Sequence, residues 1–413
     1  MNKKLLHFLG TFFLAAILSL LASNHSQAQV ISGDLVGTVL DKTGAAVPGA
    51  TIEAVNVETG VKYTTKANDA GEYRFTNLPV GAYHVSVSAA NFATTRVNGF
   101  YVELNKTVTL PITLEVQGVS NTIEVSGAAQ ALDTTTAQVT NDFTSQLVED
   151  LPSATAGSGV LNLSLLAAGV TTSGGVGVGT GPSVGGQRPR NNNFTIEGVD
   201  NNDTSVTGPL VKVPNDAVAE FSVLQNQFSP EFGHSSGGQF NTIVKSGTNE
   251  FHGMAYIYNQ NRNYDALDTL QKLGRLTTVP RFDDNRFGGN FGGPILKNKL
   301  FFFADYEYEP LGQAGVPGGN VCAPTAPGYA TINATPRLSA TNVAQFEKYV
   351  PAGTIPRAGC TPIAWTNGTA IPTAGLSLVS PSYNNTHRLV TSMDCDFSSK
   401  DQLRGRYIHD NFG

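Results

Sequence analysis

Charged residues are scarce in this chain of 413 residues: they make up 14% of it, and the net charge is −6. Nucleic-acid binding requires clustered Lys and Arg that displace counterions from phosphate, so this composition argues against a nucleic-acid partner. The chain also lacks the H-E-x-x-H zinc pattern and any convincing close pair of catalytic acids. We therefore expect neither an enzyme nor a protein that depends on a metal or another cofactor.

Long apolar runs are absent beyond the N-terminus. Two lysines precede an apolar run at 9–22, and Ser26 and Ala28 stand at the −3 and −1 positions of a cleavage site. The run is shorter than the roughly 20 residues that span a bilayer, so we expect a cleaved signal peptide at 1–28 rather than a retained membrane helix. If the mature chain meets a membrane, it does so as β-strands.

Cysteine is rare as well, with three residues. Cys322 and Cys360 fall in one loop-like segment, and they are candidates for a disulfide in an oxidising compartment. The alternative is that all three cysteines are unpaired thiols. Cys395 lies within a strand pattern, where a lone cysteine serves as an apolar filler.

Glycine is abundant instead, with 44 residues, and residues 32–117 read as short alternating strands separated by turns. Seven candidate strands occur there. In one of them Tyr83, Val85 and Val87 fall on one face while His84 falls on the other. The pattern predicts a seven-stranded β-sandwich in a mainly β protein.

Two motifs in this region give it a family resemblance. The turn D-K-T-G-A-A-V-P-G-A at Asp41–Ala50 and the run G-x-Y-x-F-x-N-L-P-x-G-x-Y at Gly71–Tyr83 resemble the carboxypeptidase regulatory-like domain. That domain shares its fold with carbohydrate-binding modules, so carbohydrate binding is implied by fold analogy alone. A spacer or docking role in the periplasm is the favoured interpretation.

Residues 118–249 mix short strands with helical patterns, among them "VLNLSLLAAGV", after which Gly169 can act as a C-cap. The stretch "QRPRNNNFTIEGVDNND" and the following strand, turn, glycine pair and strand up to Gly247 resemble the plug domain of TonB-dependent outer-membrane receptors. The segment "LQNQFSPEFG" replaces the usual arginine-glycine pair, which resembles the Oar-like branch and argues against a siderophore ligand.

Residues 250–413 show longer alternating segments with aromatic ends. In "KLFFFADYEYEP" the residues Leu300, Phe302, Ala304, Tyr306 and Tyr308 share one face, which suits lipid with an aromatic girdle. Phe301, Phe303, Asp305, Glu307 and Glu309 share the other, which suits a polar lumen. We expect turns at 297–299 and 398–401 and the start of a transmembrane β-barrel. The alternative is a soluble sandwich with half-buried strands.

A barrel that admits a plug has about 22 strands. Residues 250–413 supply only five or six, and we expect one long loop from Pro310 to Asn385. We therefore expect the N-terminal part of a longer receptor.

The resemblance implies energy-coupled uptake of a bulky extracellular ligand, such as an oligosaccharide or peptide, with TonB and the outer-membrane lipid as partners. A periplasmic or surface binding or adhesion protein that uses the sandwich is the alternative. The resemblance places the loosely defined TonB contact at Thr122, Ile123, Glu124, Val125 and Ser126. The alternative is that this stretch is a plain linker strand between the sandwich and the plug.

Polar residues of the plug-like stretch are candidates for ligand contact or for bonding the barrel wall: Arg188, Arg190, Asn191, Asn192 and Asn193. The structural role is favoured, because buried arginines are commonly paired with carboxylates. Asp305 and Glu307 are the candidate wall partners.

Overall fold

A computed structural model of the chain describes most residues from Ser32 onward. The described residues are 32–116, 122–126, 138–151, 159–172, 181–205, 208–228, 232–233, 235–267, 269–273, 279–315, 321–356, 358–365, 368–376, 380–398 and 401–412. The expected signal peptide lies outside them. One compact unit comprises the chain up to Gly253 with 290–305 and 389–409, and a second comprises 254–289, 306–388 and 410–413.

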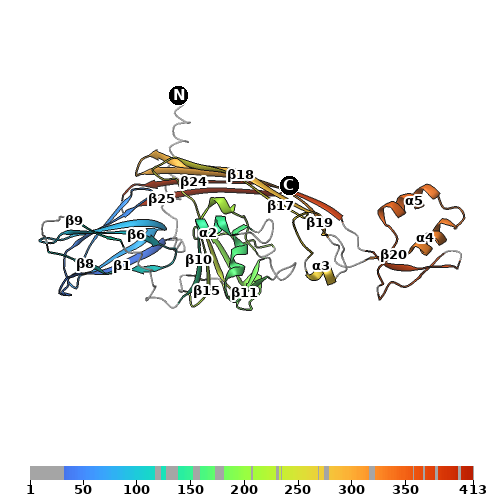
Figure 1. Cartoon of the computed structure of the whole chain (residues 1–413), viewed down its shortest axis with the longest axis horizontal. Coiled ribbons are helices and arrows are strands. Elements are labelled where there is room, and N and C mark those ends of the chain that lie inside the picture. The colour runs from blue at the N-terminus through green and yellow to red at the C-terminus, as the bar shows by residue number, and fades with distance from the viewer. Residues whose placement is uncertain are drawn as a thin grey trace, which may run out of the picture. The chain divides into compact units, whose positions relative to one another are not determined.

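Residues 32–114, together with 122–126, form a two-sheet β-sandwich, the sandwich domain (Figure 1). One sheet has the order β4-β1-β7, with β8 also paired to β1, and the other has the order β3-β2-β5-β6-β9. The strands are β1 (Ser32–Asp41), β2 (Thr51–Asn56), β3 (Lys62–Lys66), β4 (Glu72–Pro79), β5 (Gly81–Ser88), β6 (Thr94–Val102), β7 (Thr107–Thr109), β8 (Ile112–Leu114) and β9 (Thr122–Ser126).

Alternation along β5 builds the core of this domain as expected. Tyr83, Val85 and Val87 are completely buried, whereas His84 is only partly buried. The last of the seven expected strands is in fact two, because Pro111 has no N–H to continue the ladder. β7 and β8 flank this proline, and both run parallel to β1.

Residues 138–249 form a second domain, the central domain, around a sheet of order β10-β15-β16-β13-β14. Phe194, Phe221 and Phe240 stack in its core, with ring centroids 5.1 and 6.3 Å apart. The elements are β10 (Val139–Thr144), α2 (Ser145–Asp150), η1 (Gly159–Leu166), β11 (Val170–Thr172), β12 (Pro182–Val184), η2 (Pro189–Asn191), β13 (Asn193–Ile196), β14 (Val199–Asp200), η3 (Asn215–Ala217), β15 (Val218–Asn226) and β16 (Gln239–Val244).

A two-residue turn connects β13 to β14, and it is the "IEGV" of the sequence motif. Ile196 pairs with Val199, which leaves Glu197 and Gly198 at the tip. Both have positive φ, 49° and 75°. Positive φ at both positions defines the tight turn that matches the twist of a hairpin. The side chain of Glu197 is thereby held in one place, although glutamate rarely adopts this conformation.

Five long strands form one sheet, the long-strand sheet, in the order β17-β18-β19-β24-β25. They are β17 (His252–Asn261), β18 (Phe282–Leu296), β19 (Leu300–Gly315), β24 (Ser380–Asp396) and β25 (Gln402–Phe412). Turns join β18 to β19 at 297–299 and β24 to β25 after Asp396, as the sequence indicates. α3 (Thr269–Leu273) lies between β17 and β18.

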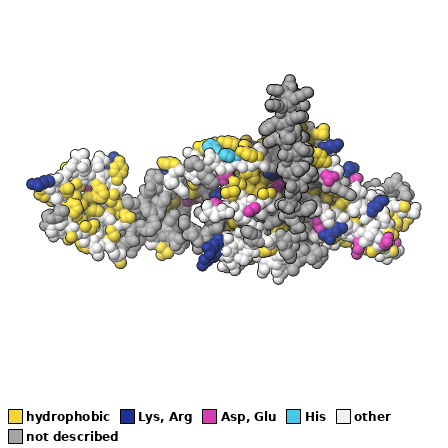
Figure 2. Space-filling view, turned by 180° about the vertical axis from the view of Figure 1, so that it is seen from behind, with side chains coloured by type: hydrophobic (Ala, Val, Ile, Leu, Met, Phe, Trp, Pro, Cys, Tyr) yellow, Lys and Arg dark blue, Asp and Glu magenta, His cyan; other side chains and the backbone are white. Residues whose placement is uncertain are grey.

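The two faces of the long-strand sheet differ in chemistry. Large apolar side chains are exposed on it, and Figure 2 shows hydrophobic side chains gathered there. The exposed ones are Met254, Ile257, Phe287, Phe291, Ile295, Leu296, Tyr306, Tyr383, Met393, Leu403 and Tyr407. Buried polar and charged side chains from the same strands are Asp284, Asp305, Glu307, Glu309, Thr386, Arg388, Ser392 and Asp394. No described helix is long and apolar enough to cross a membrane.

The expected single loop between Pro310 and Asn385 is wrong, because β19 continues to Gly315 and residues 321–376 fold into a small module, the loop module. Its core contains Tyr329, Ile332 and Val343. Its elements are β20 (Val321–Pro324), α4 (Ala326–Asn333), α5 (Ala340–Tyr349), β21 (Ile363–Ala364), β22 (Ala370–Ile371) and β23 (Thr373–Leu376). Two capping hydroxyls missed in the sequence, on Thr325 and Ser339, begin its helices.

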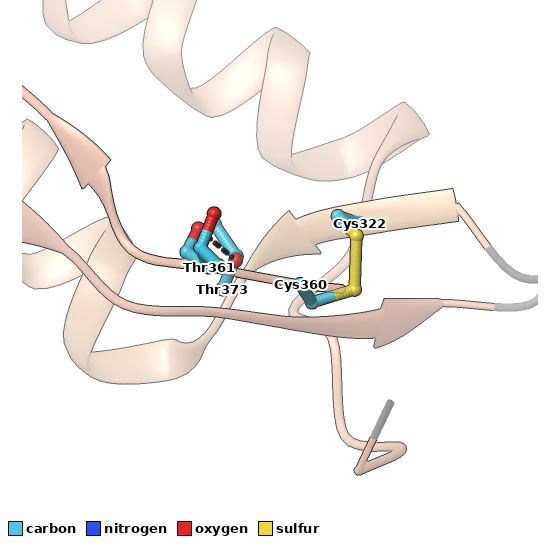
Figure 3. Close-up of a disulfide and its surroundings, with 4 residues drawn as sticks. All are labelled: Cys322, Cys360, Thr361 and Thr373. Atoms are coloured by element: carbon cyan, nitrogen blue, oxygen red, sulfur yellow. Dashed lines mark hydrogen bonds between the residues drawn. A yellow bond between two sulfur atoms is a disulfide. The ribbon is translucent and has the colours of Figure 1, made fainter. Parts of the chain in front are cut away.

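A disulfide joins Cys322 to Cys360 and fastens the loop module, as Figure 3 shows. The pairing that the sequence left open is therefore formed. Beside it the Thr373 hydroxyl donates a hydrogen bond of 2.9 Å to the Thr361 carbonyl oxygen. Cys395 is the free cysteine of the described chain, and it is partly buried.

Removing this disulfide should destabilise the loop module. The bridge closes 38 residues, for which the chain-entropy relation gives about 4 kcal/mol. The Cys322→Ser, Cys360→Ser double variant should therefore lose hydrogen-exchange protection in α4 and α5 while the central domain keeps its own. Cys395→Ser is the matched control and should change neither. Unchanged protection of α4 and α5 in the double variant would contradict the stabilising role.

Candidate functional site

Two arginines organise the charged face of the long-strand sheet, Arg388, which is buried, and Arg406, which is largely buried. Arg388 of β24 contacts three carboxylates: its Nη1 lies 2.7 Å from Glu307 and 2.5 Å from Glu309, and its Nε lies 3.3 Å from Asp410. All four side chains are at most 5% exposed. Buried carboxylates require such a partner, since desolvation of unpaired charge costs several kcal/mol. The cluster ties β19, β24 and β25 together.

Arg406 of β25 links the sheet to the central domain. Its Nε lies 2.7 Å from Glu197 at the β13–β14 turn, and its Nη1 lies 2.6 Å from Asp394 of β24. Asp394 in turn accepts a hydrogen bond from the Ser246 hydroxyl, which follows β16. Glu197 also accepts from the backbone N–H of Val244 at 3.3 Å. We call these side chains, Arg406, Glu197, Asp394 and Ser246, the clasp.

Further contacts surround the clasp. The Ser392 hydroxyl of β24 donates to the Lys245 carbonyl oxygen at 2.8 Å, and the Lys245 ammonium pairs with Glu149 of α2. Phe303 and Val390 of the sheet belong to the core of the central domain. Apolar packing and paired charge thus hold the central domain against the long-strand sheet.

Another buried carboxylate lies where the sandwich domain meets the central domain. Glu220 of β15 is fully buried and accepts a hydrogen bond of 2.9 Å from the backbone N–H of Leu104. Lys106 lies 2.9 Å from Asp142 of β10 and also pairs with Glu103. Burial is the main reason that the pKa of Glu220 is raised to about 8; the Leu104 N–H and Lys106 oppose this rise, and the charges of Asp142 and Glu103 add to it.

Two family models match the chain, one over the sandwich domain and one over the long-strand sheet. Residues 34–115 match the family model of the carboxypeptidase regulatory-like domain, and residues 243–413 match that of the outer membrane beta barrel domain. The TonB-dependent transporter Oar of Myxococcus xanthus is 26% identical over 294 residues. That match covers 68% of this chain and 27% of the relative's length.

The chain is similar to the Oar-like TonB-dependent transporters. Its long-strand sheet lies within the residues that match the outer membrane beta barrel domain, and its curated relative Oar is a TonB-dependent transporter. Among solved structures it is similar to the outer membrane transporter YddB from Escherichia coli, with TM-score 0.41, 12% identity, and coverage of 66% of this chain and 33% of that one. The ferric enterobactin receptor PfeA of Pseudomonas aeruginosa gives TM-score 0.40, 14% identity, and coverage of 66% and 32%. These scores are too low to support further argument.

The polar stretch of the Oar-like chain divides into exposed and structural residues. Arg188 and Arg190 are exposed, and neither forms an ion pair with a described residue. Asn192 donates to the Pro182 carbonyl oxygen at 2.8 Å and accepts from Gly238 N–H, while Asn193 donates to Gln239. Asn191 donates to Gln187 at 3.0 Å. The asparagines therefore order the turn.

The sequence predicts that arginines of the plug pair with carboxylates of the barrel wall. In the clasp the two kinds of residue are exchanged between the two sides. Glu307 is buried, but it pairs with Arg388 of the same sheet, and Asp305 is buried on the same strand. The carboxylate comes from the central domain, as Glu197, and the arginine comes from the sheet, as Arg406. Alternation in β25 indicates that Arg406 faces opposite Tyr407, but nothing local in the sequence identifies Glu197 as its partner.

One enzyme-like pattern occurs by letters alone. Residues 233–237 read G-H-S-S-G, which fits the G-x-S-x-G pattern of hydrolases. That pattern requires a turn from a strand into a helix, whereas here strand β16 follows. The Ser235 hydroxyl donates to the Asn191 carbonyl oxygen at 2.7 Å. In the described part of the chain no group of His, Cys, Asp or Glu is placed to hold a metal ion.

Removing the cation of the clasp should loosen the central domain. Arg406→Gln leaves Glu197 and Asp394 buried without their counter-charge, which costs about 3 kcal/mol. Amides of β13 and β14 should then exchange about 100-fold faster. Arg404→Gln is the matched control, because the hydrogen bond of Arg404 to Gln402 is long, 3.4 Å. Equal exchange rates in the two variants would contradict the clasp.

The joint at Glu220 should weaken as pH rises. The pKa is about 8 in the folded protein against an ordinary 4.5. The stability from the neutral form is complete below about pH 4.5 and is lost as pH rises through about 8. Between pH 5 and 9 the melting temperature of the native chain should therefore fall more steeply with rising pH than the melting temperature of Glu220→Gln. Glu53→Gln, at a partly exposed surface position that pairs with Lys62, is the control, and parallel curves for all three would exclude the effect.

Proposed function

We propose that this chain supplies the sandwich domain, the plug and the first wall strands of a receptor that takes up a bulky ligand through the outer membrane. TonB supplies the energy. The central domain is the plug, and the clasp is the observation that carries the proposal. A domain held by paired charges can be released by a pull, because water hydrates the separated charges once the site opens.

The TonB contact in this proposal is Thr122–Ser126, which is an extended strand, β9. Strand addition supplies affinity through backbone hydrogen bonds, so a loosely defined sequence is sufficient. The strand precedes β10 of the central domain in the chain. A pull on it is therefore directed toward the plug.

The ligand in this proposal is an oligosaccharide or a peptide. Arg188 and Arg190 are exposed on the central domain and have the donors to hold carboxylate or polar groups. The loop module is suited to contact a large ligand. Its disulfide and its own core make its surface rigid, so little conformational freedom is lost on binding.

TonB-driven movement of the plug should uncover Ser392. Its hydroxyl lies against the Lys245 backbone, so a cysteine there is covered while the central domain is in place. In cells that produce the full-length receptor with Cys395→Ser, a water-soluble thiol reagent should label Ser392→Cys several-fold faster when the cells are energised and contain TonB. A protonophore, loss of TonB or deletion of Thr122–Ser126 should remove the difference.

Glu347→Cys is the control, because this side chain of α5 in the loop module is polar and exposed. Its labelling should not depend on energy. Energy-independent labelling at both positions would contradict transport through plug movement and would favour the binding or adhesion alternative.

A further inference from the structure

The strand β9 is not isolated, although the sequence shows no partner for it. It pairs parallel with β6 of the sandwich domain, from Thr94 opposite Thr122 to Asn98 opposite Ser126 (Figure 1). It stands at the end of the sheet order β3-β2-β5-β6-β9. Among the described strands its other edge therefore has no neighbour.

The geometry of β6 limits this pairing to a short length. Between Val97 and Phe100, β6 carries one more residue than β5 opposite it, so the register shifts there. Gly99 has a φ of 79°, and a Cβ added at this glycine would meet nothing within 4 Å. Such a bulge twists a strand and ends its pairing. In the described part of the chain five residues of β9 are matched to β6, and this ladder reaches as far as the bulge.

A ladder of this kind is suited to exchange. Parallel pairing is slightly less stable per residue than antiparallel pairing. Each backbone hydrogen bond contributes little net stability, because bonds to water replace it on release. An extended strand from a partner that pairs antiparallel with the same residues can therefore replace β6 at little cost.

The position of β9 in the chain means that its release from β6 changes which domain carries an applied force. The segment continues from β9 toward β10 of the central domain. While β9 is paired with β6, a pull on it loads the sandwich domain as well as the plug. Once released, residues 115–138 can extend over about 80 Å, at roughly 3.3 Å per residue.

We propose that the edge of β6 is a resting dock for β9, and that TonB removes β9 from this edge before force reaches the plug. This inference rests on the proposed function and assigns to the sandwich domain the role of holding the coupling strand. The occupant of the β6 edge in the resting receptor is this chain's own Thr122–Ser126.

Cysteine crosslinking between β6 and β9 tests the dock. Arg96 stands opposite Glu124 in the register. In a full-length receptor with Cys395→Ser, the pair Arg96→Cys and Glu124→Cys should join with a short thiol crosslinker in cells that lack TonB. In energised cells with TonB the yield should fall at least threefold, and a protonophore should restore it.

The matched control is the pair Arg96→Cys and Ser86→Cys, which joins β6 to β5 in the same sheet. Its yield should not depend on TonB, and it shows that the sandwich domain is folded. If the control pair joins and the test pair does not join in any cells, the dock is overturned.

Two further outcomes separate this inference from the proposed function. If the test pair joins equally with and without energised TonB while Ser392→Cys labelling still responds, release from β6 is overturned and transport stands. If neither the crosslink nor the labelling responds to TonB, both proposals are overturned.

Discussion

Arg406 holds the central domain against the long-strand sheet, because a guanidinium buried between them needs carboxylates on both sides. Asp394 supplies one from the sheet, and Glu197 supplies the other from a two-residue turn. The turn requires positive φ at Glu197. This backbone conformation is unfavourable for glutamate, so it persists only because the surrounding contacts fix it. The same constraint, that buried charge must be paired, explains the Arg388 cluster elsewhere on the sheet.

Local periodicity was sufficient to predict which side chains are buried together. The alternation at 300–309 separates Tyr306 from Glu307 correctly, and the sandwich strands follow their expected faces. It was not sufficient to predict partners distant in sequence. Glu197 lies 209 residues from Arg406, and β9 pairs with β6 by backbone bonds that carry no side-chain pattern. The loop module was missed because its short helices begin at single capping hydroxyls, on Thr325 and Ser339.

The described domains form a series along the chain, and each joint in it depends on hydrogen bonds or ion pairs rather than on apolar packing alone. β9 is joined to the sandwich domain by a short backbone ladder. The sandwich domain contacts the central domain through Leu104 and Glu220, and the central domain contacts the sheet through the clasp. Polar joints of this kind separate at modest cost once water can enter. The series therefore favours transmission of a pull by stepwise release, as the proposed function requires.

The central claim is that force applied through TonB moves the plug while the barrel wall stays folded. Single-molecule pulling on the full-length receptor, held in a membrane and attached through the TonB periplasmic domain, tests it most directly. We expect the chain to lengthen first by the release of β9 and then by stepwise extension of residues from β10 onward, before TonB detaches. Detachment of TonB with no lengthening of the chain beyond β9 would contradict the account.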